Sequence, residues 1–122
     1  MTFVAVCGGR DFSDTDLLVA ILDRLVLKGD VIVHGDAKGA DSMADFYARS
    51  RGRDVIRVPA RWDSYGKGAG PRRNAVIAAL PLRLLIAFPG GVGTADMVKR
   101  ARARGIPVEE VRAATSAAPG RS

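Results

Sequence analysis

The segment LLIAFPGGVGT, residues 84–94, has the pattern of a buried β-strand that runs directly into a helix. Residues 84–88 are continuously apolar, as is typical of a strand covered on both faces. Three glycines within residues 90–93 leave the backbone amides bare, and Thr94 can cap the helix and donate a hydroxyl to a phosphate oxygen. The N-terminus of a helix favours phosphate. The segment is neither a Walker A loop, because no Lys follows its last glycine, nor a GxGxxG loop.

The same alternation of apolar and amphipathic segments extends along the chain. The expected strands comprise residues 3–7, 31–34, 55–58, 84–88 and 106–108. The expected helices lie within residues 13–29, 41–52, 71–80 and 94–105. This alternation predicts an α/β, Rossmann-like three-layer sandwich. About five parallel strands, in the order 3-2-1-4-5, are expected between four helices that cover both faces.

Particular residues mark the expected helix starts. Ser13 is predicted as the N-cap of the first helix, with Asp16 completing a capping box. Asp41 and Thr94 are predicted as N-caps of the second and fourth helices. Pro71 suits the first position of the third helix.

Composition limits the class of protein. The chain has 122 residues, of which 48% are hydrophobic and 26% charged, as in a globular domain. One Cys and one His exclude a disulfide framework and a Cys-based zinc site. No membrane span or signal peptide is evident, so a cytoplasmic location is expected. We expect one domain over residues 1–112 and a flexible tail over residues 113–122.

Positive charge is concentrated in the second half of the chain. The net charge is +6, yet residues 1–60 hold 8 basic and 9 acidic side chains, and residues 61–122 hold 11 and 4. The fourth helix carries Lys99, Arg100, Arg102 and Arg104. A nucleic-acid partner is therefore one alternative, although basic runs on helices are usually solvated faces.

Glycines gather in the loops that follow the first four strands. Ten of the 14 lie there: Gly8, Gly9, Gly35, Gly39, Gly66, Gly68, Gly70, Gly90, Gly91 and Gly93. In a parallel sheet these loops share one edge, and ligands bind there at the point where the strand order reverses. Tight turns would also explain glycine in any single loop. Glycine in four loops on one edge favours a ligand cleft.

Five motifs in order make the chain similar to a known family. They are CGGRDF (7–12), HGDAKGAD (34–41), a Trp after the third strand (Trp62), GPRRN (70–74) and PGGVGT (89–94). Together they resemble the SLOG superfamily, which includes DNA-processing protein A and the lonely-guy hydrolases. Over residues 3–108 they look most like its small YspA-like (cpYpsA-related) branch. The resemblance implies a Rossmann-like domain that binds a nucleotide or nucleotide-derived ligand, and sister families suggest a homodimer.

The chain departs from the family at two positions. The lonely-guy hydrolases carry a catalytic Glu three residues after the Thr of their PGGxGT motif. Here that position is Met97, with Asp96 one residue earlier. Met has no acid–base function, so phosphoribohydrolase activity is not expected from the resemblance. Asp36 stands where the family usually shows a second glycine, and it could narrow the pocket or add a polar contact.

The expected ligand site joins residues of these loops. Its members are Gly8, Gly9, Arg10, Asp11, His34, Gly35, Lys38, Gly39, Asp41, Trp62, Arg73, Asn74, Pro89, Gly90, Gly91, Gly93 and Thr94. Phosphate is expected on residues 90–94, with Arg10, Arg73 and Lys38 adding positive charge. Asp11 would bind the ribose hydroxyls, and Trp62 would stack on the base. No metal or other cofactor is indicated.

Other roles remain open for several of these residues. Arg10 and Asp11 could pair with each other, and Trp62 could close over the core. Cys7 is expected to be a buried thiol. The enzyme alternative is hydrolysis of a nucleoside monophosphate or an ADP-ribose-like compound, with Asp96, Asp11 or His34 in acid–base roles.

Overall fold

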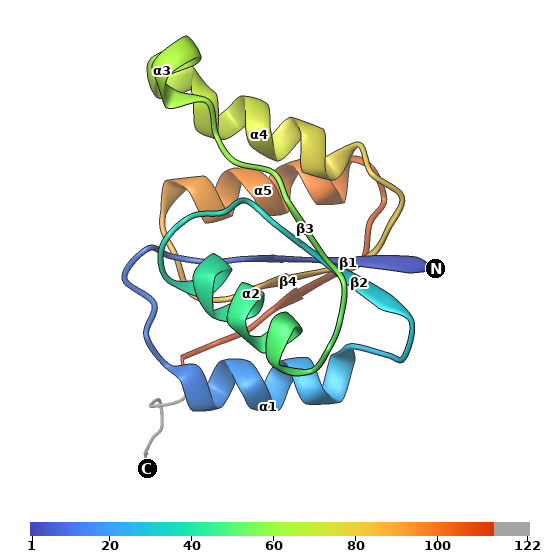
Figure 1. Cartoon of the computed structure of the whole chain (residues 1–122). Helices are drawn as coiled ribbons and strands as arrows, with labels where there is room; N and C mark the ends of the chain where they lie inside the picture. The colour runs from blue at the N-terminus through green and yellow to red at the C-terminus, as the bar shows by residue number, and fades with distance from the viewer. Residues whose placement is uncertain (114–122) are drawn as a thin grey trace.

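The computed structural model describes residues 1–113, which form one parallel five-stranded sheet between two layers of helices (Figure 1). The strands are β1 (Thr2–Cys7), β2 (Asp30–His34), β3 (Val55–Arg57), β4 (Leu82–Ala87) and β5 (Val108–Glu110). Their order in the sheet is β3-β2-β1-β4-β5, as predicted. The central strand β1 pairs in parallel with β2 and β4, so Val4 lies between Ile32 and Leu84.

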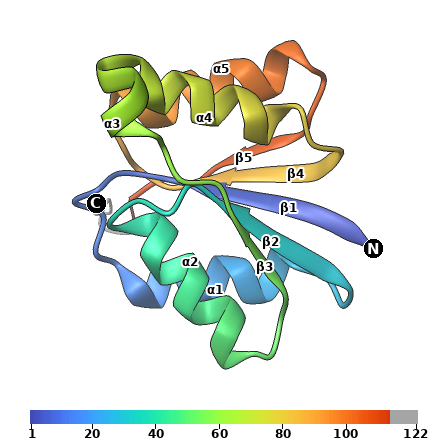
Figure 2. The ribbon, with the colours of Figure 1, turned by 45° about the horizontal axis from the view of Figure 1, so that its top comes forward.

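Four long helices and one short one connect the strands. They are α1 (Thr15–Leu25), α2 (Ala40–Ser50), α3 (Trp62–Tyr65), α4 (Ala69–Ala78) and α5 (Val92–Ala103). Helices α1 and α2 cover one face of the sheet, and α4 and α5 cover the other (Figure 2). This arrangement confirms the predicted Rossmann-like three-layer class.

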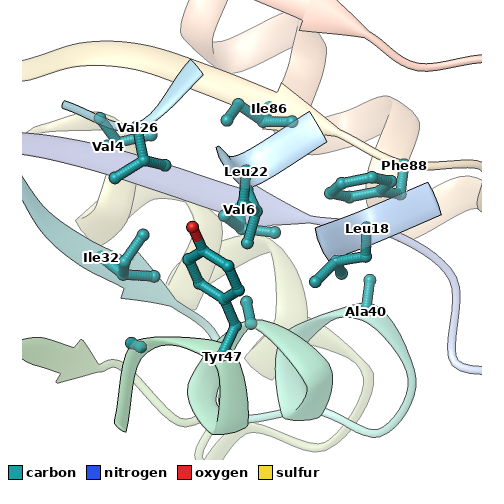
Figure 3. Packing of buried hydrophobic residues seen from close by; sticks show 12 residues of the cluster. Val4, Val6, Leu18, Leu22, Val26, Ile32, Ala40, Tyr47, Ile86 and Phe88 are labelled. Atoms are coloured by element: carbon teal, nitrogen blue, oxygen red, sulfur yellow. The ribbon is translucent and has the colours of Figure 1, made fainter. Parts of the chain in front are cut away.

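Alternation along β1 divides the core between the two faces. Val4 and Val6 pack toward α1 and α2, whereas Ala5 packs toward α4 and α5, because successive strand side chains point to opposite faces. The first layer is closed by large side chains from helix and sheet, seen together in Figure 3: Leu18, Leu22, Ile32, Tyr47, Ile86 and Phe88. Small alanines of α4 and α5 let the second layer approach the sheet closely.

All three predicted N-caps are wrong, beginning with those of α1 and α5. The N-cap of α1 is Asp14, whose carboxylate accepts the Leu17 N–H at 3.1 Å, so Ser13 and Asp16 form no capping box. Helix α5 begins at Val92, two residues before Thr94. Its N-cap is Gly91, which has no capping side chain but whose carbonyl accepts the Ala95 N–H at 3.0 Å.

The other two predicted helix starts also shift toward the N-terminus. Helix α2 begins at Ala40 with Gly39 as its N-cap, so Asp41 lies within the first turn. Helix α4 begins at Ala69, and Pro71 occupies its third position, where its missing N–H still costs no intrahelical bond. In both cases a glycine loop enters the helix before the residue that resembles a cap.

The edge strand and the loop after β3 differ from expectation. The predicted strand at residues 106–108 lies instead at Val108–Glu110, because the Pro107 carbonyl accepts the Leu85 N–H but its ring nitrogen donates nothing. Residues 62–68, expected as loop, form α3 and a 3₁₀ turn (Gly66–Gly68) that lie beyond the start of α4 (Figure 1).

No helix among residues 1–113 has the length and hydropathy required to cross a membrane. Of the predicted tail, residues 114–122 lie outside the described part of the chain.

Candidate functional site

A cavity of about 960 Å³ opens at the carboxyl edge of the sheet. It lies where the loops after β1 and β4 meet, as predicted for this strand order. Most of the expected site residues line it: Gly8, Gly9, Arg10, Asp11, Gly35, Asp41, Trp62, Arg73, Asn74, Pro89, Gly90, Gly91, Gly93, Thr94 and Asp96. Three expected residues, His34, Lys38 and Gly39, are not part of its wall. The volume is at the upper end of the usual range for small-molecule sites.

Hydrogen bonds link the loops around the cavity. The Gly9 N–H donates to the Pro89 carbonyl at 2.9 Å, and the Gly9 carbonyl accepts the Ala40 N–H at 3.3 Å. The Arg73 guanidinium donates to the Gly35 carbonyl at 2.5 Å, which ties α4 to the loop after β2. The rim is thus fixed by the protein's own contacts.

Helices α4 and α5 are joined through Asn74, which is buried. Its amide donates to the Gly93 carbonyl at 3.2 Å and to the Asp96 carboxylate at 3.0 Å. Arg100 donates to the same carboxylate at 2.9 Å. Burial alone would raise the pKa of Asp96, but hydrogen bonds from Asn74 and Arg100 outweigh it and hold the pKa below 3.8. Asp96 is therefore a charged tether between helices.

The glycines of the rim fall into two groups. A Cβ at Gly90 would collide with Thr94 Oγ1 and lie 2.6 Å from the Gly9 nitrogen. A Cβ at Gly39, where φ is +78°, would collide with the Gly9 carbonyl. These glycines allow the loops to contact each other.

Gly91 and Gly93 form the second group. A Cβ at either position would meet no atom within 4 Å, and both residues line the cavity. They are not needed for packing, and they keep side chains away from the start of α5.

The N-terminus of α5 offers unpaired donors to the cavity. The N–H groups of Val92, Gly93 and Thr94 have no hydrogen-bond partner within residues 1–113, and no side chain caps the helix. All three residues line the cavity. Unpaired N–H groups and the positive end of the helix dipole make this point suited to an anion.

His34 is fully buried beside the rim. Its Nδ1 accepts the Asp36 N–H at 2.9 Å, so the ring proton lies on Nε2, which donates to Asp45 at 2.9 Å. Both nitrogens are occupied, so His34 braces the loop after β2 rather than facing the cavity. Asp36 has a φ of +57°, a conformation that favours glycine.

Asp45 supports the loop beside the site, and sequence reasoning did not identify it. Its carboxylate also accepts hydrogen bonds from the guanidinium groups of Arg57 at 2.8 Å and Arg49 at 3.0 Å. The Asp45 side chain is only 14% exposed. Hydrogen bonds from Arg57 and then from His34 and Arg49 outweigh burial and hold the pKa of Asp45 far below its usual range. The spacing of Asp45 and Arg49 is the one signal in the sequence, an i, i+4 pair.

Acid is expected to destabilise the protein below about pH 3.8. The pKa values of Asp23, Asp30, Asp45 and Asp96 are lowered from 3.8 in the folded state. Lowered carboxyl pKa values contribute stability above pH 3.8 that is lost as the pH falls through them. Urea unfolding at a series of pH values measures this loss.

Asp45→Asn should lower the free energy of unfolding by about 1 kcal/mol at neutral pH and flatten its dependence on pH below pH 4. Asp16→Asn, on an exposed face of α1, should leave the curve unchanged; equal curves for wild type and Asp45→Asn would contradict the assignment.

Asp41 supports the loop rather than capping a helix. Its carboxylate accepts the N–H groups of Gly35 at 2.9 Å and Ala37 at 3.3 Å. Burial is the main effect on this group and raises its pKa above 3.8, although the backbone donors of Ala37 and Gly35 and the charge of Arg73 oppose it. The cavity wall near Asp41 is thus held by backbone bonds.

Aromatic side chains stand at the far end of the cavity. Trp62 lines it and is 52% exposed, and its ring lies over Gly70, where a Cβ would be 3.4 Å away. The Arg72 guanidinium lies 4.2 Å from the centre of the Tyr65 ring and so is directed away from the anion site. Trp62 leaves part of its ring free for a ligand.

The remaining candidate residues are Cys7, Arg10, Asp11 and the basic residues of α5. Cys7, expected to be a buried thiol, is only partly buried and lines the cavity. Its surroundings raise the pKa of the thiol, mainly through burial, so this residue stays protonated. Arg10 and Asp11 are exposed and make no ion pair with each other in the described structure. On α5, Arg100 pairs with Asp96 and Arg102 with Glu110, which reduces the charge available to a nucleic acid.

Comparison with known proteins agrees with this geometry. The family model described as "YspA, cpYpsA-related SLOG family" matches residues 2–65, more than half of the chain. The gene 61 protein of Mycobacterium phage D29 is 36% identical over 118 residues, which cover 88% of this chain and 94% of that protein. With its five motifs, its sheet order and its loop geometry, the chain belongs to the YspA, cpYpsA-related SLOG family.

Proposed function

We propose that the cavity binds a nucleotide or a nucleotide-derived small molecule, with a phosphate at the N-terminus of α5. The observation that carries the proposal is the set of three unpaired N–H groups at Val92, Gly93 and Thr94. They lie in the wall of a cavity large enough for a nucleotide, and the two neighbouring glycine positions are unobstructed. Family membership is consistent with such a ligand.

The other parts of the cavity suit the rest of a nucleotide. Arg10 is exposed at the mouth, and Arg73 keeps one terminal nitrogen unpaired after its bonds to Gly35 and Asn74. These cations would add to the attraction for phosphate. Asp11 is available for ribose hydroxyls, and the exposed ring of Trp62 for stacking on a base.

We favour binding without turnover over hydrolysis. Met97 is buried and carries no acid–base group, and the Asp96 carboxylate is held by Asn74 and Arg100. Both nitrogens of His34 are occupied outside the cavity wall. Incubation of the protein with a nucleotide panel, read by chromatography, is expected to show no product; conversion of any member would favour the hydrolase.

Trp62 gives a direct measurement of binding, because it is the only Trp in the chain. A base that stacks on its half-exposed ring should quench and shift its fluorescence. We expect saturable quenching by at least one member of a panel of nucleoside 5′-monophosphates, with calorimetry giving the same affinity. Trp62→Ala should weaken binding about tenfold, since stacking on one base contributes about 1–3 kcal/mol. No heat and no quenching at millimolar nucleotide would contradict the proposal.

The expected homodimer stays a prediction, derived from sister families. Light scattering on the purified protein measures its mass in solution. A monomer at micromolar concentration would contradict the dimer and leave the proposed ligand site unchanged, because the cavity is lined by residues of one chain.

A further inference from the structure

We propose that Asp11 and Asp36 act as a charge filter that restricts the cavity to ligands with a single phosphate group. The inference rests on the proposed function, which it extends from the class of ligand to its charge. It assigns a specificity-determining role to two residues on neighbouring loops, after β1 and β2.

The charge of the cavity wall is the first observation. Its basic side chains are Arg10, Lys67 and Arg73, and its acidic ones are Asp11, Asp36, Asp41 and Asp96. The wall therefore carries no excess of positive side chains, although the whole chain has a net charge of +6. A site for a polyphosphate would need cations to match several negative charges.

The acidic residues of the wall differ in what they do. Asp41 accepts two backbone N–H groups and Asp96 is bonded to Asn74 and Arg100, so both serve the fold. Asp11 and Asp36 are exposed, and their carboxylates make no hydrogen bond or ion pair within the described part of the chain. Both residues line the cavity, and both are exposed to solvent.

The backbone at Asp36 is the second observation. Its φ of +57° is a conformation in which glycine is easiest and Asn and Asp are tolerated. The N–H that bonds His34 is a backbone group that glycine also has. The Asp36 carboxylate interacts electrostatically with the Arg57 guanidinium, which is already paired with Asp45. The side chain of Asp36 is thus not needed for the turn. What it adds is a negative charge at the cavity wall.

One anion can still be bound in this setting. The N–H groups at the start of α5 are dipolar donors, and they bind a phosphate without a full positive charge. A second and third phosphate would extend from this point into a wall where the three cations Arg10, Lys67 and Arg73 face the three carboxylates of Asp11, Asp36 and Asp41. Each added phosphate then meets about as much repulsion as attraction.

Titration with AMP, ADP and ATP, and with the guanosine series, tests the filter. EDTA is included so that no divalent cation neutralises the phosphates. The wild type should bind the monophosphate at least about tenfold more tightly than the triphosphate. Asp36→Asn, Asp36→Gly and Asp11→Asn should each narrow this difference about tenfold, mainly by tightening the triphosphate. Both changes at position 36 suit its backbone, so loss of folding is not expected.

Asp16→Asn serves as the control, because it removes the same charge from α1, outside the cavity. It should leave the ratio of the affinities unchanged. A wild type that binds the triphosphate as tightly as the monophosphate overturns the filter and leaves the proposed function intact. Variants at Asp11 and Asp36 that keep the wild-type ratio overturn the filter in the same way. A wild type that binds none of these nucleotides overturns both the filter and the proposed function.

Discussion

Gly91→Val is expected to lower nucleotide affinity at least about 100-fold while the free energy of unfolding falls by only about 1 kcal/mol, the cost of a poor N-cap residue. Gly91 is the N-cap of α5, its φ of −105° is outside the left-handed region, and no protein atom lies where a Cβ would be. A side chain there would occupy the space in front of the unpaired N–H groups of the helix. The loss corresponds to about two charge-assisted hydrogen bonds.

Gly93→Ala separates this effect from folding. Gly93 lies in the first turn of α5, also with no atom near its Cβ position, and Ala in place of Gly within a helix stabilises it by about 0.5–1 kcal/mol. We therefore expect a higher Tm together with weaker binding. Gly68→Ala, in the 3₁₀ turn outside the cavity wall, is the matched control and should keep wild-type affinity. Calorimetry that gives equal affinities for all four proteins would place the phosphate elsewhere.

The fold could be predicted because its signals are local and repeated. Buried parallel strands are continuously apolar, as in residues 84–88, and the helices between them have an apolar stripe. Strand order followed from analogy with open, doubly wound parallel sheets rather than from the residues themselves. The edge strand β5 extends two residues beyond its predicted end, because its last residues, Glu109 and Glu110, are polar; an edge strand tolerates such residues, but a search for apolar runs does not find them.

Helix starts were harder, because several residues near each start can act as a cap. By residue type, Thr94 and Gly91 are both suited to be the N-cap of α5. Ser13 and Asp14 are likewise both suited to be the N-cap of α1. Which one is used depends on the path of the incoming loop, and that path is set by contacts between loops far apart in the sequence. The bond from Gly9 to Pro89 is one of these contacts.

Most of the residues that line the cavity could be predicted, but the structural role of each residue around it could not. Sequence places His34 next to the glycines of the loop after β2, yet its partner Asp45 comes from the middle of α2, one turn beyond Asp41. Only the packing of α2 on the sheet shows that Asp45 takes the imidazole while Asp41 supports the loop. A glycine in the sequence gives even less information, because some glycines keep side chains out of the cavity and others allow two loops to contact each other.

Gly39→Ala is expected to show the second use of glycine and to destabilise the protein by about 3–5 kcal/mol. Gly39 has a φ of +78° and a ψ of −125°, a conformation that costs a residue with a Cβ about 1–3 kcal/mol. The added Cβ would also collide with the Gly9 carbonyl and lie 2.7 Å from that of Arg10. Either the loop after β1 or the start of α2 must then move.

Gly29→Ala is the matched control, because Gly29 has a φ of +89° but no atom within 4 Å of its Cβ position. It measures the backbone cost alone, so urea unfolding should give a loss of about 1–2 kcal/mol. The difference between the two variants is the contribution of the close approach between the loops after β1 and β2. Equal losses would mean that this approach is not tight. A larger loss for Gly39→Ala, beside the small loss for Gly91→Val, would show that some glycines of these loops serve the fold and others the ligand.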